Sequence, residues 1–256
     1  MNPSQSAPAQ AELSYPGPLA KGFRGPGVKR VQEWLSLHGF GTAVDSEFGS
    51  ATAQALTAFQ NSVGLPATGT LEQTTWNRLV APMMKALNDG TASELPSRAQ
   101  QVAAQHLAAK AREVGGDNCG PWVRLYTGGH EGAEWKWCAG FVTFVLKQAT
   151  LELQMPMPVP GSLSCDSLAA QGANNGLLIH GAQLEAGKSW STVGPSFIFL
   201  VRRTDTDWSH TGFGFGGTPD HFDTIEGNTN DDGSANGYEV AGRVRSAQGK
   251  DFIVVR

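Results

Sequence analysis

The chain has 256 residues, of which 40% are hydrophobic and 16% are charged, and its formal net charge is −4. This composition is typical of a globular protein and excludes a disordered or fibrous chain. The sequence has no long run of lysine or arginine and no apolar stretch near the roughly 20 residues that a membrane-spanning helix needs, so we expect neither a nucleic-acid partner nor insertion into a membrane.

The chain begins with MNPSQSAPAQ, a stretch rich in Ser, Pro, Ala and Gln. Such a composition predicts a flexible leader over residues 1–15. The stretch lacks the basic end and the apolar core of a secretory signal, so we expect synthesis in the cytoplasm without classical export.

Residues 16–82 have the apolar spacing of three short amphipathic helices. Val28, Val31 and Leu35 recur at i, i+3 and i+7, as they would on one face of a helix. Ser50 can cap a second helix, and the capping-box pattern TLEQ precedes a third. We therefore predict a small three-helix bundle over this range.

Three separated pieces of this bundle resemble the peptidoglycan-binding domain 1 family: VKRVQEWLSLHGF, VDSEFGSATAQALTAFQNSVGL and TGTLEQTTWNRL. The resemblance implies that the chain binds bacterial peptidoglycan. Ser46 departs from the pattern, because the family usually has glycine after the aspartate, and we expect slight strain in that turn. We interpret Asp45 as a turn residue, and Phe59 and Trp76 as core residues, rather than as ligand contacts.

Residues 83–96 combine polar and turn-forming residues without an apolar period, so we place a linker there. A Ser-x-x-Gln pattern then begins at Ser97 and predicts the start of a helix that ends at Gly115. This helix opens a second domain over residues 97–256.

Cys138 stands at the head of an apolar run, CAGFVTFVL, that predicts a buried helix. At a helix N-terminus the dipole and the unpaired N–H groups stabilise a thiolate and lower its pKa. Such a cysteine can attack a carbonyl while its own backbone N–H helps to bind the oxyanion. The alternative is an ordinary small buried thiol.

A cysteine nucleophile needs an imidazole base, and His210 is the best placed of the six histidines. In SHTGFGFGG, strand alternation puts His210, Gly212 and Gly214 on one face, where the glycines leave a bare surface for the cysteine helix. His221 is the second choice. His106, on a helix rich in Ala and Gln, is interpreted as structural or solvated.

The next predicted strand, HFDTIEGN, places Glu226 and Asn228 on one face by its period of two. Either side chain could accept the second N–H of the imidazole and fix its tautomer. The alternative is a solvated face on an edge strand.

In order, WCAGFVTFVL, HTGFGFG and TIEGN resemble the CHAP domain, a cysteine- and histidine-dependent amidohydrolase/peptidase of the papain-like superfamily. The resemblance implies an α+β fold in which a central antiparallel sheet packs on the helix of the catalytic cysteine. It implies Cys138 as nucleophile, His210 as base and later acid, and Glu226 as orienting residue, with Asn228 as a supporting polar residue. The segment GPSFIFLVRR replaces the family's usual Gly-Asp-Ile-Val strand.

Some members of that family bind calcium through an acidic loop before the cysteine. Here the corresponding GGHEGAEWKW holds two glutamates and no aspartate. Calcium takes about six to eight oxygen ligands. We therefore expect no metal, and no other cofactor.

Three cysteines are an odd number, which leaves at least one thiol free unless it pairs between chains. Cys119 and Cys165 are two free thiols or form one bridge between loops, and the sequence leaves both readings open. By family-level loop placement, Asn118 is a candidate oxyanion donor.

A wall-binding bundle beside an amide hydrolase predicts a monomeric enzyme that reaches the cell wall after release or delivery and cleaves peptidoglycan there. The bundle would raise the local substrate concentration. The bond is that of an N-acetylmuramoyl-L-alanine amidase or of a peptide endopeptidase, and the setting is endolysin-like phage lysis or an antibacterial effector.

Two other classes remain open. One is a wall-binding protein without catalysis, which the intact Cys, His and Glu-x-Asn set argues against. The other is a cysteine hydrolase of a small soluble amide, which the N-terminal bundle argues against.

Overall fold

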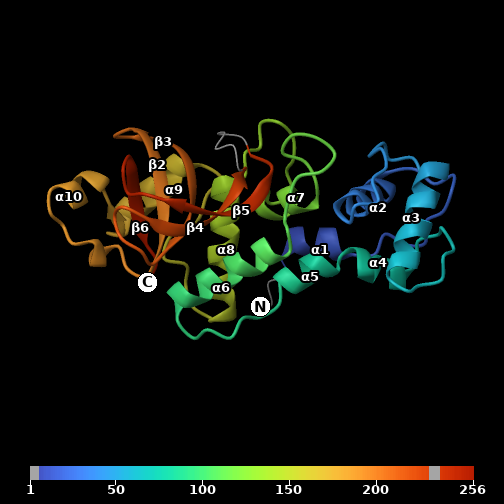
Figure 1. The fold of residues 1–256 in the computed structure, drawn as a ribbon, viewed down its shortest axis with the longest axis horizontal. Helices are drawn as coiled ribbons and strands as arrows, with labels where there is room; N and C mark the ends of the chain where they lie inside the picture. Colours follow the sequence, from blue (N-terminus) through green and yellow to red (C-terminus); the bar gives the residue numbers. More distant parts are fainter. Residues whose placement is uncertain (1–5, 231–236) are drawn as a thin grey trace.

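A computed structural model describes residues 6–230 and 237–256, which form two lobes along one long axis (Figure 1). The N-terminal lobe is helical, and the C-terminal lobe combines helices with one sheet. The predicted α+β class is therefore confirmed.

The N-terminal lobe is built on the three expected helices. These are α2 (Pro26–Leu37), α3 (Ser50–Ser62) and α4 (Gln73–Leu79), followed by the short α5 (Ala81–Ala86). Phe59 and Trp76 are almost completely buried between them, as expected of core residues, and so is Trp34. Removing such large apolar side chains from water is what stabilises a domain of this size.

The predicted capping boxes do not form. Helix α4 begins at Gln73 after Glu72, and α6 (Leu95–Ala108) begins two residues before Ser97, without a side-chain cap in either case. Pro96 lies in the first turn of α6, where its fixed φ suits the helix and its missing N–H costs nothing. Proline chemistry, rather than the Ser-x-x-Gln pattern, therefore defines this helix start.

The turn at Ser46 is left-handed, with φ of 65°, as the departure from glycine predicts. The buried side chain of Gln32 holds this turn. Its Oε1 accepts hydrogen bonds from the backbone N–H groups of Asp45 and Ser46, at 3.1 and 2.9 Å, and its Nε2 donates to the Asp45 carboxylate. These bonds stabilise a conformation that a serine adopts only at some cost.

The prediction of a flexible leader is wrong for the part of residues 1–15 that the structure describes. Residues Ala7–Leu13 form helix α1, which contacts α7 (Pro121–Thr127) of the C-terminal lobe. The indole N–H of Trp76 donates to the carbonyl oxygen of Leu13 at 2.8 Å. The local composition does not reveal this helix, because its partners lie far along the chain. Residues 1–5 are outside the described residues.

The C-terminal lobe contains a six-stranded sheet in the order β1-β6-β2-β3-β4-β5, and every neighbouring pair is antiparallel. The strands are β1 (Leu178–Ile179), β2 (Ser196–Thr204), β3 (Asp207–Phe215), β4 (Phe222–Thr229), β5 (Glu239–Arg245) and β6 (Lys250–Val254). Helix α8 (Cys138–Glu152) packs on β3 and β4, as expected of the cysteine helix. The remaining helical elements are α9 (Cys165–Asn174), α10 (Gly181–Glu185) and η2 (Trp190–Thr192).

Helix α8 does not pack against the glycines of β3. A Cβ atom built on Gly214 would lie 2.1 Å from the ring of Phe197, and one on Gly212 would lie 2.9 Å from the ring of Phe199. Phe213 instead belongs to the core that includes the side chains of α8, such as Phe141. The expectation that these glycines admit the cysteine helix is therefore wrong, because phenylalanines of β2 occupy that face.

The two lobes are docked by a buried ion cluster. The guanidinium of Arg124 on α7 pairs with Glu12 of α1 at 2.7 Å, with Glu33 of α2 at 2.7 Å and with Glu131 at 2.6 Å. Lys29 pairs with Glu131 from the side of α2. The linker predicted over residues 83–96 is therefore not a free hinge, and its first residues lie in α5 and its last residues in α6.

Among the described residues, no helix combines the length and the apolar character that crossing a membrane requires.

Candidate active site

Cys138 is the first residue of α8, as the sequence predicts, and its side chain is 7% exposed. The residue before it, Trp137, is fixed by a hydrogen bond of 2.8 Å from its indole N–H to the Glu113 carboxylate. The backbone N–H of Ala139, in the first turn of α8, also favours the thiolate of Cys138. The thiol therefore lies at an unpaired helix start and is held there by its neighbours.

His210 and Glu226 are joined by a hydrogen bond of 2.9 Å between His210 Nε2 and Glu226 Oε2. The pairing of β3 with β4 runs from Phe215 only as far as Phe213, opposite Ile225, so His210 lies where the two strands have separated. Because Nε2 is held by the carboxylate, Nδ1 is the ring nitrogen left for the thiol.

The pKa of His210 is raised to about 9. Burial is the largest single influence and would lower it, but the hydrogen bonds and charges of Cys138 and Glu226 together outweigh burial. The imidazole is therefore protonated at neutral pH, opposite two groups that carry negative charge.

Glu226 is completely buried and receives four hydrogen bonds. Arg245 on β5 donates through Nε at 2.8 Å and through Nη2 at 2.7 Å, and Thr224 donates its hydroxyl at 2.6 Å. Burial alone would raise the pKa of this carboxyl, but Arg245 and His210 lower it to about 2. A carboxylate without such partners would be costly to bury as a charge.

The pKa of Cys138 lies well below the usual thiol range. The first cause is a hydrogen bond from Cys165, and the second favourable cause is the His210 imidazole, against the effect of burial. The two sulfur atoms are 4.0 Å apart. Cys165, whose own pKa is raised by Cys138 and by burial, remains the protonated donor of the pair.

This placement decides between the two readings of the remaining cysteines. All three thiols are free, and Cys165 lies beside Cys138 rather than bridging to Cys119. Cys119 is partly exposed, and its sulfur contacts the carbonyl oxygen of Asp117.

Asn228 is on the expected strand but not on the expected face. A register shift between Glu226 and Thr229 breaks the alternation, and Asn228 takes a left-handed φ of 52°. Its amide donates to the side chains of Asn118 and Glu113, at 3.2 and 3.3 Å. Asn228 thus supports the loop before Trp137 rather than the imidazole.

Asn118 is fully buried in the same group, and its amide donates to the carbonyl oxygen of Ala133 at 3.0 Å. Its Oδ1 accepts from Asn228. The side chain therefore organises the loop that precedes Cys138, in place of the oxyanion role expected of it.

The other described histidines have different partners. His106 is buried between Tyr126 and Gln148, and His130 stacks on Trp135. His180 contacts Asp251, and the second-choice base His221 lies exposed beside Thr218. In the part of the chain that the structure describes, His210 is the histidine that favours the Cys138 thiolate.

Three site residues escaped the sequence analysis: Arg245, Cys165 and Glu113. Arg245 sits in GRVR, an alternating stretch that places two arginines on one face of a strand, and this was the available signal. Nothing local marks Cys165 or Glu113, because their roles arise from contacts with α8 and the residue before it.

No group of three or more His, Cys, Asp or Glu side chains within residues 6–230 and 237–256 is arranged to hold a metal ion.

One part of the chain matches a known protein family. Residues 24–79 match the family described as "Putative peptidoglycan binding domain", which indicates that the chain binds peptidoglycan. No curated protein matches the chain, and no solved structure matches it. The match lies within the N-terminal lobe and does not extend to the C-terminal lobe.

Proposed function

We propose that this chain is a cysteine-dependent hydrolase that cleaves an amide bond of bacterial peptidoglycan. The observation that carries the proposal is the connected set Cys138, His210 and Glu226, in which a thiol at a helix start faces an imidazole held by a buried carboxylate. This is the arrangement that activates a cysteine nucleophile, and it supports the papain-like, CHAP-type interpretation of the C-terminal lobe.

The first half of the reaction forms a thioester. The Cys138 thiolate attacks the amide carbonyl, and the carbon–nitrogen bond breaks as the His210 imidazolium gives its proton to the departing amine. Backbone N–H groups at the start of α8 are the nearest donors for the oxyanion of the tetrahedral intermediate.

The second half releases the product. His210, now neutral, takes a proton from water, and the resulting hydroxide attacks the thioester carbonyl. The carbon–sulfur bond breaks, the carboxylic acid leaves, and the thiolate–imidazolium pair is restored. Glu226 stays ionised throughout, because Arg245 holds it with two hydrogen bonds.

The N-terminal lobe matches a peptidoglycan-binding family, and this supports peptidoglycan as the substrate of the hydrolase. Both lobes face the same polymer in this proposal, so the anchor and the hydrolase act on one molecule of peptidoglycan. The N-acetylmuramoyl-L-alanine amidase and the peptide endopeptidase reactions use the same catalytic groups. Delivery by phage-type lysis or as an antibacterial effector fits either bond.

The test is digestion of purified peptidoglycan by the wild-type chain and by Cys138→Ala, with the new termini identified by mass spectrometry. Release of intact stem peptides by wild type alone would identify an amidase, and cut cross-links would identify an endopeptidase. If neither chain cuts walls that both chains bind, the hydrolase proposal fails and a non-catalytic wall-binding protein is the better account.

A further inference from the structure

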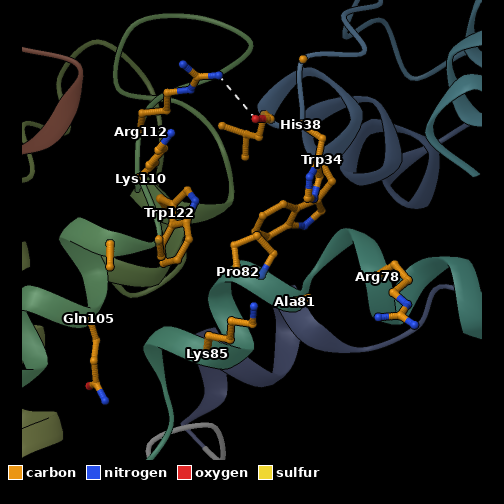
Figure 2. A pocket seen from close by; sticks show the side chains of 14 residues that line it. Trp34, His38, Arg78, Ala81, Pro82, Lys85, Gln105, Lys110, Arg112 and Trp122 are labelled. Carbon is orange, nitrogen blue, oxygen red and sulfur yellow. Dashed lines mark hydrogen bonds between the residues drawn. The ribbon is translucent and has the colours of Figure 1, made fainter. Parts of the chain in front are cut away.

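A cavity of about 720 Å³ opens at the seam between the lobes, away from Cys138. Figure 2 shows Trp34 of the N-terminal lobe beside Trp122 of the C-terminal lobe in its lining, with Pro82 and Lys85 of α5 below them. The two indoles lie edge to face, with centroids 6.1 Å apart. Both lobes and the segment that joins them therefore build this cavity.

The cavity is positively charged. Its lining contains four lysines and arginines, and no aspartate or glutamate is among the described residues that form it. Within the described part of the chain, no ion pair involves Arg78, Lys85 or Lys110. Cations gathered without counter-charges favour an anionic ligand.

Two buried polar atoms of the lining also lack partners. Trp34 is 1% exposed, and its indole N–H has no acceptor among the described residues. Gln105 donates its amide to the carbonyl oxygen of Asn88, but its buried Oε1 accepts nothing from that same part of the chain. Buried polar groups are nearly always hydrogen-bonded in folded proteins, so each such atom calls for an explanation.

A single class of ligand satisfies these observations together. It offers an acceptor to the Trp34 N–H, a donor to Gln105 Oε1, a negative charge to the cations and some apolar surface to lining residues such as Leu37 and Pro82. A peptide with a free carboxylate provides all four.

We propose that the seam cavity is a binding site for carboxylate-bearing peptides, namely the stem peptides of peptidoglycan. The anionic-peptide chemistry follows from the cavity alone, whereas the assignment to the wall stem rests on the proposed function. The site is separate from the scissile bond at Cys138, so a stem bound here belongs to a different part of the polymer from the one being cut.

Isothermal titration with a soluble stem peptide tests the proposal. The full chain carrying Cys138→Ala is the background, which prevents turnover. Adding Lys85→Gln with Lys110→Gln is expected to weaken binding about tenfold, and Trp34→Phe, which keeps an aromatic ring and removes the N–H, about threefold or more. Lys188→Gln, an exposed lysine outside the cavity, is the matched control and leaves the affinity unchanged.

Two further probes identify the chemistry. The same peptide with amidated carboxylates should bind about tenfold more weakly and lose its sensitivity to the lysine variants. A neutral N-acetylglucosamine oligomer should bind equally to all variants. Unchanged thermal unfolding of each variant shows that the fold is intact, and a second Trp34 variant, Trp34→Leu, which also has no side-chain donor, repeats the loss with a different side chain.

The proposal is overturned if the stem peptide does not bind, if it binds all variants equally, or if the neutral oligomer loses affinity in parallel. Binding to isolated cell walls separates this result from the proposed function. A chain that binds and cuts walls while its cavity variants bind the stem peptide normally refutes the cavity site alone. A chain that binds the peptide through the cavity but neither binds nor cuts walls refutes the wall assignment instead.

Discussion

Two imidazoles in the C-terminal lobe, the completely buried His106 and the largely buried His210, have opposite acid–base properties. The pKa of His106 falls to about 4, and that of His210 rises to about 9. His106 is completely buried among neutral partners, with Tyr126 at 2.8 Å and Gln148 at 3.2 Å, so burial dominates. His210 faces a thiolate and a carboxylate, and these charges reverse the effect of burial.

Burial alone therefore does not decide the protonation state of a histidine. Burial keeps the ring neutral where the partners are uncharged, and anionic partners stabilise the charged ring in spite of burial. His106 is kept neutral and joins α6 to α7 and α8, whereas His210 is kept ready to give up a proton. Four measurements test how charged partners control these ionisable groups.

The largest effect is expected for the His210→Ala variant. Loss of the general acid and base should lower the rate of muropeptide release on the order of 10³-fold. The matched variant His106→Gln should keep the rate near that of wild type once folded, because its ring touches no reacting group. Chromatography of released fragments measures both rates, and equal losses in the two variants would remove the distinction between the histidines.

Glu226→Gln should lower the rate on the order of 10²-fold, because the orienting group then lacks its charge. In wild type, the thiolate–imidazolium pair persists up to the His210 pKa, so kcat/KM should fall above about pH 9. In the variant this alkaline limb should move to lower pH. Asp223→Asn, an exposed acid on the same strand, should leave the pH profile in place, and an unmoved limb in Glu226→Gln would contradict the role assigned to the carboxylate.

His106 should contribute to the pH dependence of stability. Its folded pKa of about 4 lies below the unfolded value of 6.5, so the unfolded state binds more protons between these values. The contribution is fully present above pH 6.5 and is lost as the pH falls through 4, on the order of 3 kcal/mol in total. Denaturant titrations over this pH range measure the free energy of unfolding of wild type and His106→Gln. This free energy should fall less steeply with falling pH in the variant, and equal pH dependence in the two proteins would rule the contribution out.

The smallest effect is expected for Cys165→Ala. Removing the thiol that donates to Cys138 should raise the nucleophile's pKa, since that hydrogen bond is the first cause of its depression. The rate of alkylation of Cys138 by iodoacetamide near pH 6 should fall about 2–10-fold, the size of a neutral hydrogen bond. Cys119→Ala is the control, and faster alkylation in Cys165→Ala would reverse the proposed direction.

Local patterns predict the elements of the site but not the contacts between them. The apolar run after Cys138 and the alternation around His210 and Glu226 are short-range signals. They predicted Cys138 at a helix start and a contact between His210 and Glu226, and the structure contains both. Arg245 reaches Glu226 only through the register of β4 with β5. Asn228 was misplaced because a bulge in that same ladder interrupts the period of two.

The same reason explains the errors at the N-terminus. Composition describes residues 7–13 as a leader because the partner of Glu12 is Arg124, in the other lobe. When a residue contacts a segment so distant in sequence, its sequence neighbours do not indicate that contact. The glycines of β3 were likewise predicted from their own strand, whereas the neighbouring β2 determined which face they cover.

The ion cluster around Arg124 has a consequence for how the polymer would be cut. Lobes joined by a loose tether would sample many cleavage points around one anchor. Here α1, α2 and α7 are held together by buried ion pairs, so anchor and thiol keep one separation and one relative orientation. An enzyme built in this way would cleave at a fixed distance from its binding point. The spacing of its cuts along the wall would then be set by the distance between its two lobes.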